Sequence, residues 1–154
     1  MFESTAVDAV DFQILNLLRE NGRASYASIG SEVGLSAHGA ADRIRRLERR
    51  GAIIGYTALI DLEHVGRSLD ALIDVRLLPT TDHEQFEAQV EELPAVREVL
   101  FLTGRFDYQL RVACRDADDL DATVRSIRRH GGAAHTETRI AMRSRTYDRR
   151  VGEA

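Results

Sequence analysis

Five arginines lie between Arg43 and Arg50, in a segment that also carries the signals of a helix. Arginine presents a planar fork of N–H donors that matches phosphate oxygens and the edge of guanine. Ser36 is a suitable N-cap for this helix, Gly51 is a suitable stop, and arginines near the end suit the negative end of the helix dipole. The predicted chemistry is hydrogen bonding to DNA phosphates and base edges.

The apolar residues of this segment share one helical face. Ala40, Ile44 and Leu47 recur at i, i+4 and i+7, which leaves the other side to polar residues. A solvated amphipathic helix has the same pattern, so the flanking elements must decide between the two interpretations. The expected DNA-binding residues are Ser36, His38, Gly39, Asp42, Arg43, Arg45, Arg46 and Arg49. Arg45 and Arg49 are expected to lie nearer the phosphates than the others.

The residues before this segment predict two further helices. The first covers residues 8–20 with apolar residues at a 3.6 period, and the second begins at a cap on Ser25 and ends near Val33. Gly34-Leu35 then provides a tight turn into the arginine-rich helix. Three helices with such a turn between the last two are the helix-turn-helix arrangement. The β-rich stretch 52–60 that follows predicts a strand and a small wing.

The composition is that of an ordinary globular protein. Its 154 residues suffice for one domain or two small ones, with 44% hydrophobic and 30% charged residues. All 21 basic residues are arginine, and the net charge is −4. Acids and bases balance over residues 1–60, whereas acids outnumber bases over residues 61–138. The overall negative charge therefore does not exclude a DNA-binding N-terminal region.

Metal, cofactor and membrane chemistry have no support in the residue pattern. Cys114 is the only cysteine, which excludes a disulfide framework and a thiolate zinc site, and the five histidines lack metal-ligand spacing. No apolar run approaches the roughly 20 residues that span a bilayer, and the N-terminus does not resemble a signal peptide. We expect a cytoplasmic protein with no membrane partner, no metal and no cofactor.

Residues 61–67 are polar, contain a glycine and mark the change in charge, so they predict a linker. Beyond it, strands and helices alternate in the order βαββαβ. Strands are expected at residues 71–77, 96–103, 107–113 and 136–145, with helices after a capping box at Thr81 and after Asp116 or Asp118. Two βαβ halves in tandem indicate a ferredoxin-like sandwich, in which both helices cover one face of a four-stranded antiparallel sheet.

A sheet covered on one side leaves its other face for a partner subunit to shield. Leu72, Phe101 and Leu110 are expected on that uncovered face, and a one-residue slip in register would reverse the assignment. The predicted fold class is α+β, with an N-terminal winged helix-turn-helix domain over residues 1–60. The linker joins it to a ferredoxin-like βαββαβ domain over residues 68–154.

Several short motifs, taken in their order and spacing, resemble the Lrp/AsnC family, the feast/famine regulators of bacteria and archaea. The resemblance runs from about Val7 to Arg145. Its motifs are Val7-Asp8-x-x-Asp11-x-x-Ile14-Leu15, Val33-Gly34-Leu35-Ser36, Arg43-Ile44-x-x-Leu47-Glu48-x-x-Gly51-x-Ile53, Gly55-Tyr56-Thr57 and Leu102-Thr103-Gly104-x-x-Asp107-Tyr108. The chain departs from the family at Ala37-His38-Gly39-Ala40, where members often carry proline.

The resemblance implies a DNA-binding transcriptional regulator whose second domain, of the RAM type, binds an amino acid or a related metabolite. It also implies dimers that assemble further, often to octamers. Gly104, Asp107 and Tyr108 match the family's effector loop at a subunit interface, and Thr136 and Thr138 resemble hydroxyl positions near it. Asp107 has two interpretations: an ammonium partner for the effector, or a carboxylate that only caps its own turn.

Two other functions have to be weighed. A siroheme-decarboxylase group resembles this architecture and would place histidines and arginines around a tetrapyrrole carboxylate. The candidates are His130, His135, Arg105 and Arg111. No paired acid and base or nucleophile and base is recognisable, so no catalytic residues are assigned and an enzyme is not favoured. An amino-acid-sensing module without DNA contact would leave the arginine-rich helix unexplained.

Overall fold

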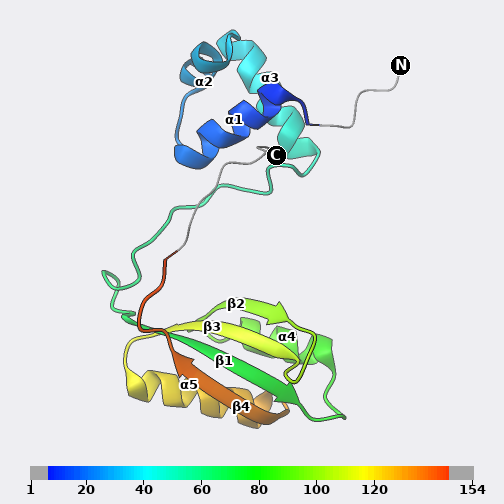
Figure 1. The fold of residues 1–154 in the computed structure, drawn as a ribbon, viewed down its shortest axis with the longest axis vertical. Coiled ribbons are helices and arrows are strands. Elements are labelled where there is room, and N and C mark those ends of the chain that lie inside the picture. The colour runs from blue at the N-terminus through cyan, green and yellow to red at the C-terminus, as the bar shows by residue number, and fades with distance from the viewer. Residues whose placement is uncertain (1–6, 146–154) are drawn as a thin grey trace. The chain divides into compact units, whose positions relative to one another are not determined.

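The computed structural model describes residues 7–145, which divide into two compact units, 7–59 and 60–145 (Figure 1). The first unit contains three helices, and the second contains a four-stranded sheet with two helices. Each unit has its own apolar core. This arrangement confirms the α+β class and the helix-turn-helix followed by a sheet domain. In the described part of the chain, no helix is long and apolar enough to cross a membrane.

The first unit consists of α1 (Ala9–Glu20), α2 (Tyr26–Val33) and α3 (Ala37–Arg49). The predicted caps form: the side chain of Ser25 accepts from Ser28 N and that of Ser36 accepts from Gly39 N. The turn between α2 and α3 passes through Gly34, whose φ of +71° is a left-handed conformation that glycine adopts without strain. The core of the unit is formed by Ile14, Ile29, Ala40, Ile44 and Leu47, all nearly inaccessible to water.

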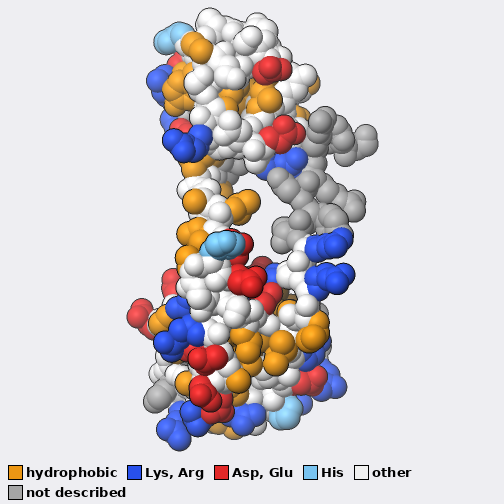
Figure 2. All heavy atoms as spheres, turned by 90° about the vertical axis from the view of Figure 1, so that its left-hand side faces the viewer, with side chains coloured by type: hydrophobic (Ala, Val, Ile, Leu, Met, Phe, Trp, Pro, Cys, Tyr) orange, Lys and Arg blue, Asp and Glu red, His pale blue; other side chains and the backbone are white. Residues whose placement is uncertain are grey.

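The expected strand and wing over residues 52–60 do not form. The chain there has no ladder partner within residues 7–145, and Ile54 and Leu59 are 98% and 99% exposed. Hydrophobic side chains along the segment that connects the two units are visible in Figure 2. A β-rich sequence becomes a strand only when another strand satisfies its N–H and C=O groups, and residues 7–59 of this unit supply none.

The close approach of α2 to the following turn gives a testable prediction at Gly30. A Cβ added there would lie 2.6 Å from the carbonyl oxygen of Leu35 and 3.0 Å from that of Ser36. Because backbone must shift to relieve this contact, we expect Gly30→Ala to destabilise the first unit by about 1–3 kcal/mol. Gly39→Ala is the control: its Cβ meets nothing closer than 3.4 Å, and removing glycine from a helix stabilises it by about 1 kcal/mol. Chemical denaturation of both variants checks the opposite signs.

The second unit has the order β1 (Leu69–Leu77), α4 (His83–Glu91), β2 (Val96–Phe101), β3 (Tyr108–Cys114), α5 (Ala117–His130) and β4 (Ala133–Ile140). Its antiparallel sheet has the strand order β2-β3-β1-β4. Apolar residues of the strands pack with Phe86 and Val90 of α4 and with Leu120 and Ile127 of α5, which places both helices on one face. This is the predicted ferredoxin-like sandwich.

The bounds of β4 and the N-cap of α4 differ from the prediction for physical reasons. β4 begins at Ala133 and ends at Ile140, rather than covering residues 136–145, because its ladder follows β1 from Leu77 to Ala71. The N-cap of α4 is Asp82, whose carboxylate accepts from Gln85 N. Thr81 was expected in that place, but its hydroxyl donates to the carbonyl of Gly132 at 2.9 Å.

The uncovered face of the sheet is polar rather than apolar. Leu72 lies there and is half-buried, as predicted. The assignments of Leu110 and Phe101 were wrong by one residue of register: Leu110 is fully buried in the core, and Phe101 contacts Tyr108 on the helix side. Ion pairs occupy the face instead. They join Arg111 to Asp70 and Arg139 to Asp74.

Candidate nucleic-acid interface and effector hairpin

The exposed side of α3 carries His38, Asp42, Arg45 and Arg49, as the helical pattern predicts. Asp42 lies between two partners: its carboxylate is 3.2 Å from Nε2 of His38 and accepts from Arg45 at 3.0 Å. Arg49 has no ion pair among residues 7–145. All four side chains face solvent, so this stripe presents cationic donors around a single carboxylate.

The N-terminal end of α3 adds a backbone component to the stripe. Ser36 is exposed, and its hydroxyl oxygen accepts from the N–H of Gly39 at 3.1 Å. Gly39 leaves the helix surface without a side chain next to His38. The first turn of a helix has free N–H groups and a positive dipole end, which attract phosphate. Six of the eight predicted DNA-binding residues therefore lie on the accessible side or the accessible N-terminal turn of α3.

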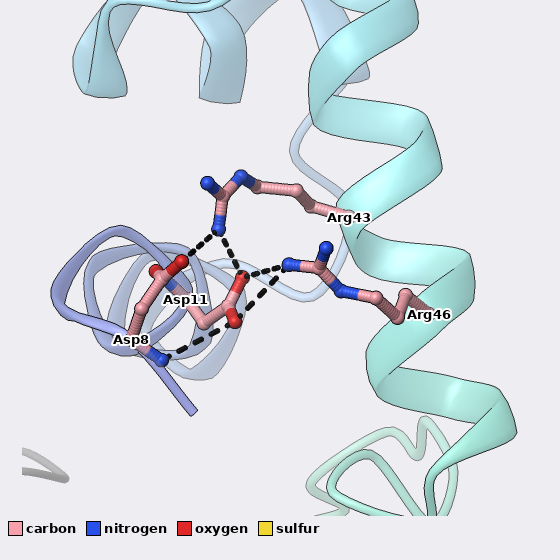
Figure 3. Close-up of polar contacts among 4 residues, drawn as sticks. All are labelled: Asp8, Asp11, Arg43 and Arg46. Carbon is pink, nitrogen blue, oxygen red and sulfur yellow. Dashed lines mark hydrogen bonds and ion pairs between the residues drawn. The ribbon is translucent and has the colours of Figure 1, made fainter. Parts of the chain in front are cut away.

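The other two predicted residues, Arg43 and Arg46, point toward α1 (Figure 3). Nη1 of Arg43 donates to Asp8 at 2.6 Å and to Asp11 at 2.7 Å. Nη2 of Arg46 donates to both carboxylate oxygens of Asp11, at 3.2 and 3.3 Å. We call these four residues the α1–α3 ion cluster. In this cluster, the guanidinium groups that the helical pattern alone assigns to DNA donate to carboxylates of α1 instead.

The α1–α3 ion cluster ranges from buried to exposed. The Asp11 side chain is 1% exposed, whereas that of Asp8 is 49% exposed. The hydrogen bond from Arg43 lowers the pKa of Asp8, and both carboxylates raise the pKa of Arg43. Asp8 and Asp11 also form the capping box of α1, each side chain accepting from the other's backbone N–H. Their roles as partners of α3 were not predicted, although two acids and two arginines at equal spacing of three residues were a usable signal.

The hairpin between β2 and β3 holds three of the predicted effector residues. Gly104 has a φ of +119°, a conformation that residues with a side chain rarely adopt. Asp107 accepts from the backbone N–H of Leu77 at 2.8 Å, and its own N–H donates to Val75. One carboxylate oxygen of Asp107 thus connects the hairpin to β1. This is a structural role, as in the interpretation of Asp107 as a turn cap, but the partner lies on β1 and not in the turn.

Tyr108 is a core residue whose hydroxyl reaches α4. The side chain is 1% exposed, and the hydroxyl donates to Glu87 at 2.7 Å and lies 3.0 Å from Nδ1 of His83. Burial, with Glu87 as acceptor, raises the pKa of Tyr108. Thr136 is also buried, and its hydroxyl accepts from Arg128, whereas Thr138 is exposed.

The ladder brings some of these residues into one row. Tyr108 and Thr136 are both paired with Val75, and Thr138 follows two residues further along β4. Gly104 lies beyond the strand ends, in the hairpin itself. A cleft of about 400 Å³ lies between α4 and β2, but none of the predicted effector residues lines it.

Three of the four candidates for the enzyme interpretation contact other residues, and the side chain of the fourth, His130, lies outside the described part of the structure. Arg105 pairs with Glu137 at 3.0 Å and lies over the ring of Phe106, on which His135 stacks. Arg111 is bound to Asp70 on the uncovered face of the sheet. Within the described residues, no group of three or more His, Cys, Asp or Glu is arranged to hold a metal ion.

Comparison with known proteins decides the family. The AsnC-type helix-turn-helix domain matches residues 7–48, and the Lrp/AsnC ligand binding domain matches residues 70–151. The chain belongs to the Lrp/AsnC family. Its DNA-binding half is thus the family's helix-turn-helix, and its sheet domain is the family's ligand-binding domain.

Relatives of this Lrp/AsnC chain are named as transcriptional regulators. The leucine-responsive regulatory protein of Haemophilus influenzae is 31% identical over 89% of this chain and 84% of its own length. A transcriptional regulator of Neisseria meningitidis, solved as an L-methionine complex, has a TM-score of 0.89 and 28% identity over 96% of this chain and 97% of that one. The feast or famine regulatory protein of M. tuberculosis, also complexed with L-methionine, has a TM-score of 0.87 and 29% identity over 94% and 97%. The enzyme interpretation finds no support among these proteins.

Proposed function

We propose that this Lrp/AsnC regulator reads its operator with the exposed side of α3. The observation that supports this most is the solvent-facing stripe of His38, Asp42, Arg45 and Arg49, next to the free N–H groups of the first turn. Arg45 and Arg49 bind phosphates, while Ser36, His38 and Gly39 come close to the bases. Asp42 accepts from a cytosine amine, which is the contact that a carboxylate makes in the major groove.

The phosphate contacts give a prediction that can be measured without knowing the operator. We expect Arg45→Ala and Arg49→Ala each to weaken binding to all duplexes by a similar factor and to lower the salt slope by about one. The control is Arg125→Ala, which removes an exposed arginine of α5. Affinities are measured at several salt concentrations on duplexes selected by the unmodified protein from a random pool. If both α3 variants keep the unmodified affinity and salt slope, α3 is not the DNA-contacting helix.

We also propose that an amino acid binds at the hairpin and changes DNA affinity or assembly. Two relatives have been solved with L-methionine, and the family's ligand-binding domain covers this hairpin. The ammonium group meets the Asp107 oxygen that Leu77 does not use, and the carboxylate meets backbone N–H groups beside Gly104 or the hydroxyl of Thr138. Tyr108 and Thr136 contribute by shaping the site, because their hydroxyls already have partners.

A thermal-shift screen of the twenty amino acids tests the effector site. We expect at least one amino acid to raise the melting temperature, and Asp107→Asn to abolish that shift, because asparagine can still accept from Leu77 N but carries no charge. Asp121→Asn, an exposed acid on α5, should leave the shift unchanged. No shift with any amino acid contradicts the effector proposal and leaves the DNA proposal standing. A shift that survives in Asp107→Asn removes this residue from the site.

We further propose that the chain forms dimers that associate to higher oligomers, octamers among them, and that it acts in the cytoplasm without catalysis of its own. Exposed Ile54 and Leu59, in a stretch without strand pairing, favour self-association. We take residues 1–60, 61–67 and 68–154 as its DNA-binding domain, linker and effector domain. Light scattering at micromolar concentration should give a dimer or larger species, and a monomer would contradict the proposal.

A further inference from the structure

The carboxylate of Asp11 is buried in the α1–α3 ion cluster, away from the exposed stripe of α3. Its side chain is 1% exposed, yet it accepts from two arginines of the recognition helix, Arg43 and Arg46 (Figure 3). Two cations around one buried anion compensate the loss of its hydration. The two arginines remain about 26% and 32% exposed, so the cluster extends from the core to the surface.

Stability alone does not account for such an arrangement. A buried ion pair contributes little net stability, because the cost of removing the charges from water is similar to their attraction, and an apolar group often serves as well. The Nε–H of Arg46 is in addition buried without a hydrogen-bond partner. The arrangement is therefore geometrically specific and energetically expensive.

The position of the cluster allows it to control the orientation of α3 against α1. Arg43 and Arg46 lie on the flank of α3 between the apolar face and the exposed stripe, at the positions next to Asp42 and Arg45 in sequence. Bonds from two successive turns of α3 to one carboxylate oppose rotation and sliding of α3 against α1. A free pair of arginines on this flank would instead bind any phosphate within reach.

We propose that Asp11 is a positioning residue for DNA recognition: it fixes the orientation of α3 and withholds Arg43 and Arg46 from non-specific phosphate contacts. The inference rests on the proposed use of α3 for DNA binding, and it goes beyond it because Asp11 contacts no DNA. Its measure is the discrimination ratio, the affinity for a selected operator divided by that for a random duplex.

The test compares Asp11→Asn with Asp8→Asn in the full chain. Asparagine keeps the size of the residue and one acceptor oxygen. It removes the negative charge with which both arginines pair, so the arginines become available to other anions. We expect Asp11→Asn to bind the random duplex as well as or better than the unmodified protein, and the discrimination ratio to fall by about tenfold, the equivalent of one mismatched base pair. Asp8→Asn loses only the exposed partner of Arg43, so its ratio should be unchanged.

Partial unfolding gives a different result, because it lowers both affinities together and leaves the ratio unchanged. Arg46→Lys is the second variant, in case Asp11→Asn does not fold: lysine keeps the charge, but its ammonium group ends one bond short of the Nη2 that contacts Asp11, so the ratio should fall here too. An unchanged ratio in the folded variants overturns the inference. Failure of the unmodified protein to bind DNA, or of the Arg45 and Arg49 variants to weaken binding, would instead contradict the proposed function.

Discussion

Replacing both Arg43 and Arg46 with alanine is expected to destabilise the helix-turn-helix unit by about 3–5 kcal/mol. The cause is the Asp11 carboxylate, which would remain buried after both of its cationic partners are removed. What remains is the weak contact of 3.3 Å with the N–H of Asp8. Urea denaturation followed by helix circular dichroism measures the effect.

A matched double variant and a rescue variant test whether the buried carboxylate causes the loss of stability. The double variant Arg45→Ala with Arg49→Ala also removes two cations from α3, but both are exposed, so its stability should change by no more than about 0.5 kcal/mol per site. Adding Asp11→Leu to the Arg43 and Arg46 variant should restore much of the lost stability, because the buried position then holds an apolar group. Equal losses in the two double variants would show that the buried carboxylate is not the cause.

Phe86→Ala is expected to destabilise the sheet unit by about 3–5 kcal/mol. Phe86 of α4 is fully buried, and its ring lies 4.7 Å from that of Tyr108. Phe101→Ala is the matched control: it removes another phenyl ring, 5.1 Å from the same tyrosine, but one that is 66% exposed. We expect this second loss to be much smaller, and urea titrations of both variants, monitored by tyrosine fluorescence, compare them. A control loss as large as that of Phe86→Ala would contradict the assignment of the core.

The helices and the order of helices and strands along the chain were predictable because their signals are local. Caps at Ser25, Ser36 and Asp116 and apolar periodicity determine where helices form, and these features do not depend on the rest of the fold. The stretch 52–60 shows the limit of local signals. Its β propensity is high, but a strand also needs a partner, and the sequence does not say whether this unit provides one.

The site was predictable only as far as one helix determines it. The helical pattern separates the apolar face of α3 from the rest, and it correctly exposes His38, Asp42, Arg45 and Arg49. It does not show which neighbour covers the flank, so it does not reveal that Arg43 contacts Asp8 and Asp11. The assignment of Leu110 and Phe101 to the uncovered face was wrong for a related reason. Strand alternation predicts two faces, and only the ladder register tells which face meets the helices.

The most direct test of α3 as the DNA-contacting helix is photo-crosslinking of the full chain to a selected operator. Duplexes carrying 5-iodouracil at single positions are irradiated in the complex, and the crosslinked peptide is identified by mass spectrometry. We expect crosslinks within residues 36–49, from the N-terminal turn of α3 to its last exposed arginine. Crosslinks confined to the sheet unit, residues 60–145, would contradict this role of α3.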